Sequence, residues 1–285
     1  MKFLKKLSNV PIIGTFARTI MKYGANREAK QISDHFSQFL EPQLARSDSM
    51  RESAFRIRHN VYCEELNFEE LQENQQETDD FDAHSFHCLI QHKSTRNFAG
   101  TVRVVYSNGE DQLLPFEKYC MDSVNHETLS PANFDRREIC EISRLAVPAE
   151  FRRRQMDKYA GAATGVINET TYSERELRCF PFIAVGLYLS AASVVLDKNI
   201  HHCFVMMEPR LARSLAFVGI KFTQIGPVVD YHGRRAPYHI DPRELANTLS
   251  PGFKRLFKNI RKQLQGEQPT KLDELDNLGT PATPH

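Results

Sequence analysis

The sequence predicts an α/β protein with a mixed central sheet flanked by helices, of the α+β type. Two short alternating runs at 86–92 and 98–107, separated by the polar stretch KSTRN, are typical of an antiparallel β-hairpin. A strand-like run at 139–147 is followed by helical and strand-like segments in alternation, and this order favours a sheet with helices on its faces. With 285 residues and 41% hydrophobic composition, the chain is long enough to bury a full core.

The N-terminal stretch combines positive charge with apolar residues. In residues 1–30, seven lysines and arginines stand against Glu28 alone. We assign 1–48 to a basic amphipathic extension, with two interpretations open: an arm on an anionic membrane, or a helix that covers the domain. Residues 31–46 are predicted to be helical. A secretory signal is not expected, because Pro11 and Gly14 interrupt the short apolar run.

The predicted domain, 49–248, begins with a helix and an acidic loop. From Ala54, the run AFRIRHNVYCEELNF has apolar and aromatic residues at helical spacing. The loop LQENQQETDDFDAHS follows it and ends in three aspartates. It lacks the glycine and the terminal glutamate of a calcium loop, and no other metal-ligand spacing occurs, so no metal site is predicted.

The chain is organised around 138–154, which reads EICEISRLAVPAEFRRR. Its first part is a buried strand that Pro148 ends by removing a backbone donor. Glu141, Ser143 and Arg144 are crowded into this apolar run, although burying an unpaired carboxylate is costly. Either Glu141 pairs with Arg144 inside the core, or these polar groups line a reaction cleft with the arginines at 152–154 placed to receive phosphate.

The second half supplies the remaining core elements. The apolar run FPFIAVGLYLSAASVVLDKN is predicted to be a core helix, because Asp197 and Lys198 end it before it is long enough to span a membrane. HHCFVMM at 201–207 is the next strand, and 208–219 is a helix capped by Gly219. Two more strands are expected around Gly226 and Gly233.

The C-terminal end has two parts. Residues 249–265 form a second basic amphipathic helix, with apolar positions that include Phe253, Phe257 and Ile260. A tail at 266–285, rich in proline, threonine and acidic residues, is predicted to be disordered. Together with the N-terminal extension, the helix suggests peripheral contact with the inner face of a membrane; in the alternative, its apolar residues pack against the domain and only the lysines face outward.

Composition narrows the functional classes. The formal charge of +1 excludes a globally basic surface of the kind that binds nucleic acid. Six cysteines are scattered without any CxxC spacing, which indicates reduced thiols and a cytoplasmic protein. No run of about 18 uncharged apolar residues is present to span a membrane.

Four ordered motifs carry a family resemblance. FRIRHNVYCEELNF, DDFDAHS, GTVRVV and EISRLAV resemble, in order and rough spacing, the acyl-homoserine-lactone synthases, which have the GNAT-type acyltransferase fold. FRRR, GLYLSAAS and MMEPRLARSLAFVGIKFTQIGPVVDYHGRRAPY are similar to acyltransferases associated with PEP-CTERM/exosortase systems, which group with the N-acyl amino acid synthases. The resemblance covers about 50–242 and implies a GNAT-like domain at 49–248.

The resemblance also implies a set of site residues. Glu141, Ser143 and Arg144 match the family's catalytic ExSR group. The residues that match its acceptor pocket are Arg58, Tyr62, Phe68, Asp79, Asp82 and Arg103. The aspartates fit equally well as fold-stabilising partners of Arg58 or Arg103. Phe68 stands where homoserine-lactone synthases usually have Trp, and this chain has no Trp at all, so the acceptor is left open.

The chemistry of these residues agrees with acyl transfer. An ammonium group must lose a proton before it attacks a thioester, and Glu141 is the candidate base. In GNAT-type folds, backbone N–H groups of the central strand stabilise the oxyanion, here near Leu145, Ala146 and Val147. The phosphopantetheine arm is expected between this strand and HHCFVMM. Its phosphate, or an acidic carrier protein, would meet the three arginines Arg152, Arg153 and Arg154 unless these merely begin a solvated helix.

The sequence therefore predicts an N-acyltransferase. It would move a fatty acyl group from acyl carrier protein, or from coenzyme A, to the amine of an amino acid or a similar small molecule. No bound cofactor is expected, because acyl-phosphopantetheine is a co-substrate. Two alternatives are an acyl-homoserine-lactone synthase and a non-catalytic module that binds acyl thioesters.

Overall fold

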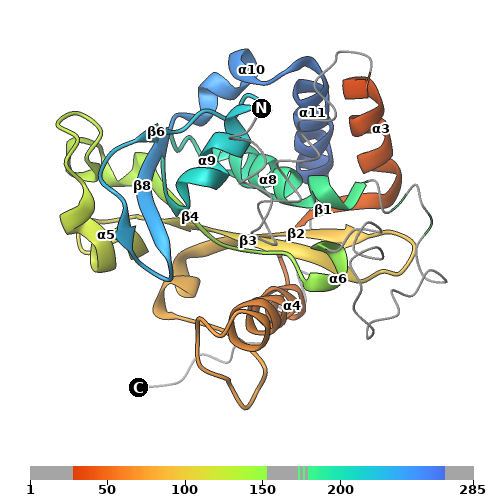
Figure 1. The fold of residues 1–285 in the computed structure, drawn as a ribbon, viewed down its shortest axis with the longest axis horizontal. Coiled ribbons are helices and arrows are strands. Elements are labelled where there is room, and N and C mark those ends of the chain that lie inside the picture. The colour runs from red at the N-terminus through yellow and green to blue at the C-terminus, as the bar shows by residue number, and fades with distance from the viewer. Residues whose placement is uncertain (1–27, 153–172, 174–175, 177–178, 267–285) are drawn as a thin grey trace, which may run out of the picture.

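The computed structural model describes residues 28–152, 173, 176 and 179–266. The predicted basic arm before residue 28, the arginines at 153 and 154, and the predicted tail after residue 266 lie outside the described residues. Figure 1 shows a central sheet with helices on both faces.

The sheet has the strand order β1-β2-β3-β4-β5-β8-β6, with β7 paired to β8. The strands are β1 (Leu40–Leu44), β2 (Ser85–His92), β3 (Phe98–Tyr106), β4 (Ile139–Ala146), β5 (His202–Met207), β6 (Thr223–Gln224), β7 (Val229–Asp230) and β8 (Arg234–Ile240). All described neighbours are antiparallel except β4 and β5, which run parallel. The predicted mixed sheet and the β2–β3 hairpin are confirmed.

The helices form a layer on each face of the sheet. The α-helices are α3 (Glu28–Phe39), α4 (Asp48–Arg58), α5 (Pro115–Cys120), α6 (Ala149–Arg152), α8 (Ile183–Asp197), α9 (Pro209–Ala216), α10 (Leu245–Thr248) and α11 (Pro251–Gly266). A π-helix, η2 (His59–Glu65), continues α4, and short 3₁₀ turns include η3 (Asp80–His84) and η8 (Phe180–Phe182). In Figure 1, α4 lies on one face, while α8, α9, α11 and α3 lie on the other.

The segment predicted to be helical at 31–46 divides into a helix and a strand. Helix α3 ends at Phe39, and Leu40–Leu44 form edge strand β1, which pairs antiparallel with β2. Pro42 fits this position because an edge strand can lack one backbone donor. The sheet therefore begins before the predicted domain boundary at residue 49.

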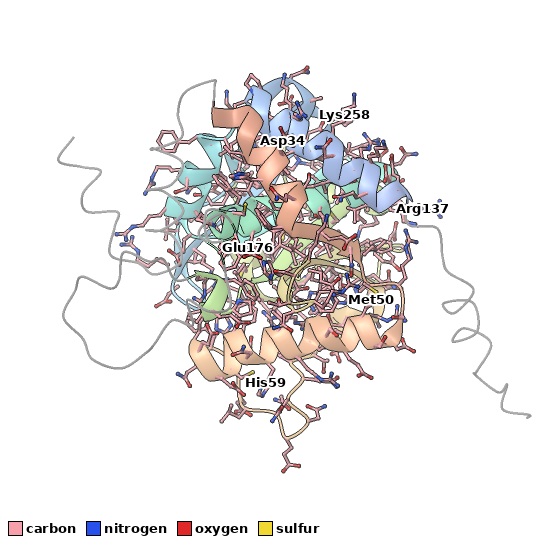
Figure 2. The ribbon with its side chains drawn as sticks, turned by 90° about the vertical axis from the view of Figure 1, so that its right-hand side faces the viewer. Asp34, Met50, His59, Arg137, Glu176 and Lys258 are labelled. Atoms are coloured by element: carbon pink, nitrogen blue, oxygen red, sulfur yellow. The ribbon has the colours of Figure 1, made fainter. Side chains whose placement is uncertain are left out.

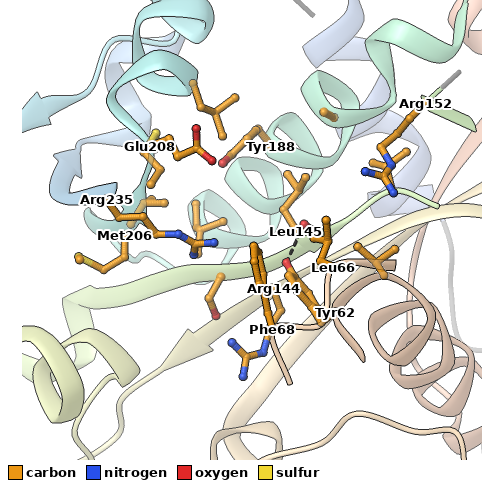
Figure 3. A pocket seen from close by; sticks show the side chains of 18 of the residues that line it. Tyr62, Leu66, Phe68, Arg144, Leu145, Arg152, Tyr188, Met206, Glu208 and Arg235 are labelled. Atoms are coloured by element: carbon orange, nitrogen blue, oxygen red, sulfur yellow. Dashed lines mark hydrogen bonds between the residues drawn. The ribbon is translucent and has the colours of Figure 1, made fainter. Parts of the chain in front are cut away.

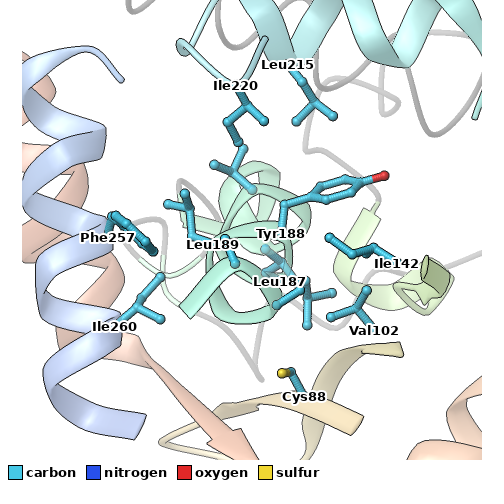
Figure 4. Close-up of a cluster of buried hydrophobic side chains, with 14 of the residues drawn as sticks. Cys88, Val102, Ile142, Leu187, Tyr188, Leu189, Leu215, Ile220, Phe257 and Ile260 are labelled. Carbon is cyan, nitrogen blue, oxygen red and sulfur yellow. The ribbon is translucent and has the colours of Figure 1, made fainter. Parts of the chain in front are cut away.

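Helix α8 is the core helix that the sequence predicts. The predicted reason, that the run is too short to span a membrane, is wrong, because Phe180–Asp197 is long and apolar enough to do so. It is a core helix because 78% of it is buried inside the protein. Figure 4 shows Leu187 of α8 close to Val102 and Cys88 of the sheet, with α11 on the other side. This burial on almost every side explains why the helix is apolar all round.

The apolar side of α11 belongs to the core. The residues buried along it are Phe253, Leu256, Phe257, Ile260 and Leu264, which pack in the same cluster as α8. Lys254, Lys258 and Lys262 are exposed instead, and Figure 2 shows Lys258 on the outer side of the helix. The prediction that Phe253, Phe257 and Ile260 meet a membrane is therefore wrong, because the fold already buries them.

Candidate active site

The parallel strands β4 and β5 separate in the middle of the sheet. They pair at Cys140 with Cys203 and at Glu141 with Phe204, and the ladder goes no further. A cavity of about 330 Å³ opens beyond this point, between the C-terminal part of β4 and the end of β5. The separation leaves backbone of β4 facing the cavity instead of a neighbouring strand.

A β-bulge shapes β4 at the same point. Thr101 of β3 lies opposite Ala146, whereas Arg103 lies opposite Ser143, so β4 carries one extra residue. Arg144 has φ 51°, in the left-handed region, which typically costs about 1–3 kcal/mol. The Tyr62 hydroxyl donates to the Leu145 carbonyl at 2.8 Å. Bulges change the direction of side chains. The hydrogen bond from Tyr62, which lies on η2, holds this bulge in place.

The large cavity is mainly apolar. Figure 3 shows its walls, which come from η2, the end of β4, α8 and the end of β5. Its apolar and aromatic lining includes Val61, Leu66, Leu145, Val147, Phe151, Phe180, Tyr188, Met207 and Leu211. Cavities of this size and character bind small molecules with substantial apolar surface.

A smaller chamber of about 60 Å³ adjoins the cavity. The two spaces share the walls formed by Tyr62, Phe68, Ser143, Arg144, Met206 and Arg235. The remaining walls of the chamber are Glu69, Asp79, Arg103, Pro115, Tyr119, Glu141, Tyr231 and His232. All three predicted catalytic residues therefore meet here, together with four of the predicted acceptor residues.

Glu141 is the chamber's most isolated carboxyl group. Its side chain accepts one hydrogen bond, from the Phe116 backbone N–H at 2.7 Å. Burial raises the pKa of Glu141 to about 7, although this hydrogen bond, Arg103 and Arg144 favour the charged form. A carboxyl group with such a pKa exchanges protons near neutrality, as a general base requires.

The predicted core ion pair between Glu141 and Arg144 is absent among the described contacts. Arg144 instead bonds Glu77 at 3.2 Å and Glu69 at 3.0 Å, and its guanidinium lies 5.6 Å from the Tyr62 ring centroid. Its pKa is raised, because these carboxylates outweigh the effect of burial. Arg144 is thus held as a cation at the junction of the two spaces.

A buried ionic network lies behind the chamber. Arg58 bonds Glu77 at 2.5 Å and Asp82 at 2.6 Å, and Arg103 bonds Asp82 at 2.9 Å and Asp79 at 2.5 Å. Burial alone would raise the pKa of Asp82, but its bonds to Arg58 and the charge of Arg103 hold that pKa well below the usual range. The network also reaches the site, because Arg103 donates to the Ser143 hydroxyl at 3.2 Å.

This arrangement corrects two predicted acceptor contacts. Arg58 is fully buried, and neither Arg58 nor Asp82 lines a cavity. Asp82 holds Arg103 in place, and Arg58 holds Glu77. This agrees with the alternative interpretation, in which the aspartate stabilises the fold as a partner of the arginines. Tyr62, Phe68, Asp79 and Arg103 do face the chamber.

The predicted donor residues lie at the large cavity or outside the described part. Leu145 and Val147 line the cavity, whereas Ala146 is buried behind them. Arg152 also lines it and forms an ion pair with Glu65. Arg153 and Arg154 lie outside the described residues.

Several site residues carried no predicted role. Glu69, Glu77, Tyr188, Tyr231, His232 and Arg235 are among them. Arg235 and His232 belong to the run VVDYHGRRAPY, where a turn with Gly233 at φ +95° connects β7 to β8. From the sequence, this run predicts strand structure and carries part of the family resemblance, and its two consecutive arginines are the signal of a further role.

Comparison with known proteins identifies the class. Residues 57–162 match the GNAT acetyltransferase domain family. A comparison with curated proteins finds no match. Together with the fold, the GNAT match shows that this protein is an acyltransferase. Its fold is of the GNAT acyltransferase type.

Solved structures share the fold at low sequence identity. The CoA-dependent acyl-homoserine lactone synthase BjaI, with SAM and isopentyl-CoA, has a TM-score of 0.51 and 14% identity, covering 84% of this chain and 99% of BjaI. TofI, in a ternary complex with an inhibitor and MTA, has a TM-score of 0.51 and 14% identity, covering 74% of this chain and 98% of TofI. These similarities establish a common fold.

Proposed function

We propose that this protein is an N-acyltransferase that moves a fatty acyl group from a phosphopantetheine thioester to the amine of an amino acid or a similar small molecule. One observation carries the proposal: an apolar cavity of about 330 Å³ adjoins a polar chamber of about 60 Å³ at Ser143 and Arg144. An acyl chain matches the first space, and a small charged amine matches the second.

The chamber supplies acid–base chemistry. The Glu141 carboxylate takes a proton from the acceptor ammonium, directly or through water, and frees its lone pair. The amine nitrogen attacks the thioester carbonyl carbon, the C–N bond forms, and the C–S bond breaks to release the thiolate. Nitrogen loses its second proton once the C–N bond has formed, and this proton neutralises the thiolate, so the thiol leaves. Glu141 gives the first proton to solvent and returns to its carboxylate form.

The donor arm is proposed to lie where β4 and β5 separate. Unpaired β4 backbone beyond Glu141 is suited to donate to the developing oxyanion, because such donors are fixed before the reaction starts. Arg152 at the cavity, with Arg153 and Arg154 after it, is proposed to meet the phosphate of the arm or an acidic carrier protein. Acyl carrier protein is the preferred donor in this proposal, with coenzyme A as the alternative.

A similar fold suggests a second acceptor class. The BjaI structure contains SAM and isopentyl-CoA, so a SAM-type acceptor belongs to the alternative in which this protein is an acyl-homoserine-lactone synthase. A cytoplasmic location, inner-membrane contact through the N-terminal arm, and an exosortase association stay predictions from the sequence.

Mass spectrometry of lipid extracts tests the proposal. Cells that express the full chain should accumulate N-acyl amino acids that are absent from cells expressing the Glu141→Gln variant. Purified protein should form the same products from acyl carrier protein or coenzyme A thioesters and a mixture of amino acids. Acyl-homoserine lactones as the products would select the alternative enzyme. Thioester binding without turnover would indicate a non-catalytic module and overturn the proposal.

A further inference from the structure

Three arginines line the polar chamber, and two of them already have carboxylate partners. Arg103 bonds Asp79 and Asp82, and Arg144 bonds Glu69 and Glu77. Arg235 forms no ion pair with any described carboxylate, and its buried Nε has no hydrogen-bond partner. A half-buried guanidinium with an unused donor is costly to maintain, and at the wall of a chamber this makes Arg235 a candidate for contact with a bound anion.

The place of Arg235 is defined by β8. It is the second residue of the strand and lies opposite Val229 of β7, just after the turn at Gly233. It lines both the large cavity and the small chamber. Figure 3 shows its guanidinium extending toward the middle of the site, on the side facing Phe68 and Arg144.

Guanidinium groups bind planar anions with two parallel hydrogen bonds, and carboxylate and phosphate are the usual partners. The phosphate of the donor lies at the far end of the pantetheine arm from the thioester, so it does not reach the reaction centre. A carboxylate on the acceptor does. The chamber also offers Glu141 and Asp79 to an ammonium group, so it presents opposite charges to the two ends of an amino acid.

We propose that Arg235 binds the carboxylate of the acceptor and makes the enzyme select α-amino acids over amines that lack a carboxylate. This inference rests on the proposed function and deepens it. The chamber volume of about 60 Å³ corresponds to roughly five water-sized groups, which suits the amine, the α-carbon and the carboxylate. Methionine-derived acceptors such as S-adenosylmethionine carry the same two groups, so this assignment holds for them as well.

Matched probes test the inference by binding and by turnover. Calorimetry and initial rates compare phenylalanine with 2-phenylethylamine, and serine with ethanolamine, because each pair differs only by the carboxylate. The wild-type protein should prefer the amino acid of each pair. Arg235→Gln should weaken its binding, and raise its KM, by about 10- to 100-fold, because a hydrogen bond to a charged group is lost. Binding of the two amines should stay unchanged, because they lack the carboxylate.

Arg234→Gln is the matched control. Arg234 is exposed, and successive residues of a strand point to opposite faces, so this variant removes the same charge from the same strand outside the site. It should behave like the wild-type protein. Arg235→Lys should recover only part of the preference, because lysine keeps the charge but not the planar pair of donors.

The outcomes separate this inference from the proposed function. If the wild-type protein binds both members of each pair equally or binds none of the four, or if Arg235→Gln weakens acid and amine alike, the assignment of Arg235 is wrong. If the protein acylates amino acids and the matching amines at equal rates, the proposed function stands and the role of Arg235 in selecting the carboxylate is wrong. Selective binding of amino acids without acylation by any donor would support Arg235 and overturn the proposed function.

Discussion

Two carboxyl groups that both feel the charge of Arg103, Asp82 and Glu141, have pKa values shifted in opposite directions. Asp82 has a side chain only 9% exposed, and it receives hydrogen bonds from both Arg58 and Arg103. Glu141 is 4% exposed and receives one hydrogen bond, from a neutral backbone N–H. The pKa of Asp82 is lowered, whereas burial raises the pKa of Glu141 to about 7.

The side chains of Asp82 and Glu141 are both largely removed from solvent. The guanidinium partners of Asp82 therefore account for the difference between the two pKa shifts. Buried carboxylates with guanidinium partners remain ionised and hold structure, whereas those without such partners bind a proton near neutral pH. The site thus combines a permanently charged support on η3 with a titrating group on β4. A carboxyl group with a strongly perturbed pKa in a cavity is a candidate for catalysis.

The largest expected effect is the loss of the titrating group. Glu141→Gln should reduce kcat by about a hundredfold to ten-thousandfold, because removal of a general base typically costs that much. In the wild-type protein, the rate should rise with pH through about 7, as the Glu141 carboxyl ionises. Steady-state kinetics across this pH range measures both effects. An unchanged kcat in the variant, or the same acid limb in both profiles, would exclude Glu141 as the base.

The polar cluster of β4 was predictable because its residues contradict their surroundings. Glu141, Ser143 and Arg144 interrupt a strand that otherwise consists of core residues, and each lines the chamber. The order of strands and helices was predictable for the same reason, because the signal for each element lies within its own segment. The observed sheet confirms this order. A local sequence pattern is informative when one segment contains both the apolar residues of a core strand and the polar residues that depart from them.

Residues that meet through the fold were not predictable in the same way. Glu77 receives hydrogen bonds from Arg58 and Arg144, which come from a helix and a strand distant in sequence. Nothing in its glutamine-rich loop separates it from the other acidic residues there. Arg235 likewise reaches the site only because β8 pairs with β5. Strand β1 was missed because its short sequence continues the helical pattern before it.

The supporting network should have the next largest effect, on stability. Arg58→Met leaves Glu77 and Asp82 without their shared partner in a buried setting, and should cost about 3–5 kcal/mol in the free energy of unfolding. Arg56→Met is the control, because Arg56 forms an exposed pair with Glu52 and should cost less than about 0.5 kcal/mol. Urea denaturation measures both. Equal losses in the two variants would show that the network is not a stabilising unit.

The smallest expected effect is the pH dependence of stability, which has opposite signs at the two carboxyl groups. A folded-state pKa of about 7 for Glu141, above its ordinary 4.5, means that folding binds a proton. That contribution is complete below pH 4.5 and is lost as the pH rises through about 7, on the order of 3 kcal/mol for a shift of this size. Glu141→Gln should therefore gain stability relative to wild type between pH 5 and pH 8.

Asp82→Asn provides the opposite case in the same experiment. The lowered pKa of Asp82 means that its contribution is present above its ordinary pKa of 3.8 and is lost only as the pH falls through the lower folded-state value. The deficit of Asp82→Asn should thus be constant between pH 5 and pH 8, where Asp82 is ionised in both states. Chemical denaturation at several pH values gives both curves. Parallel curves for wild type and Glu141→Gln would show that Glu141 does not bind a proton on folding, and would remove the contrast between the two carboxyl groups.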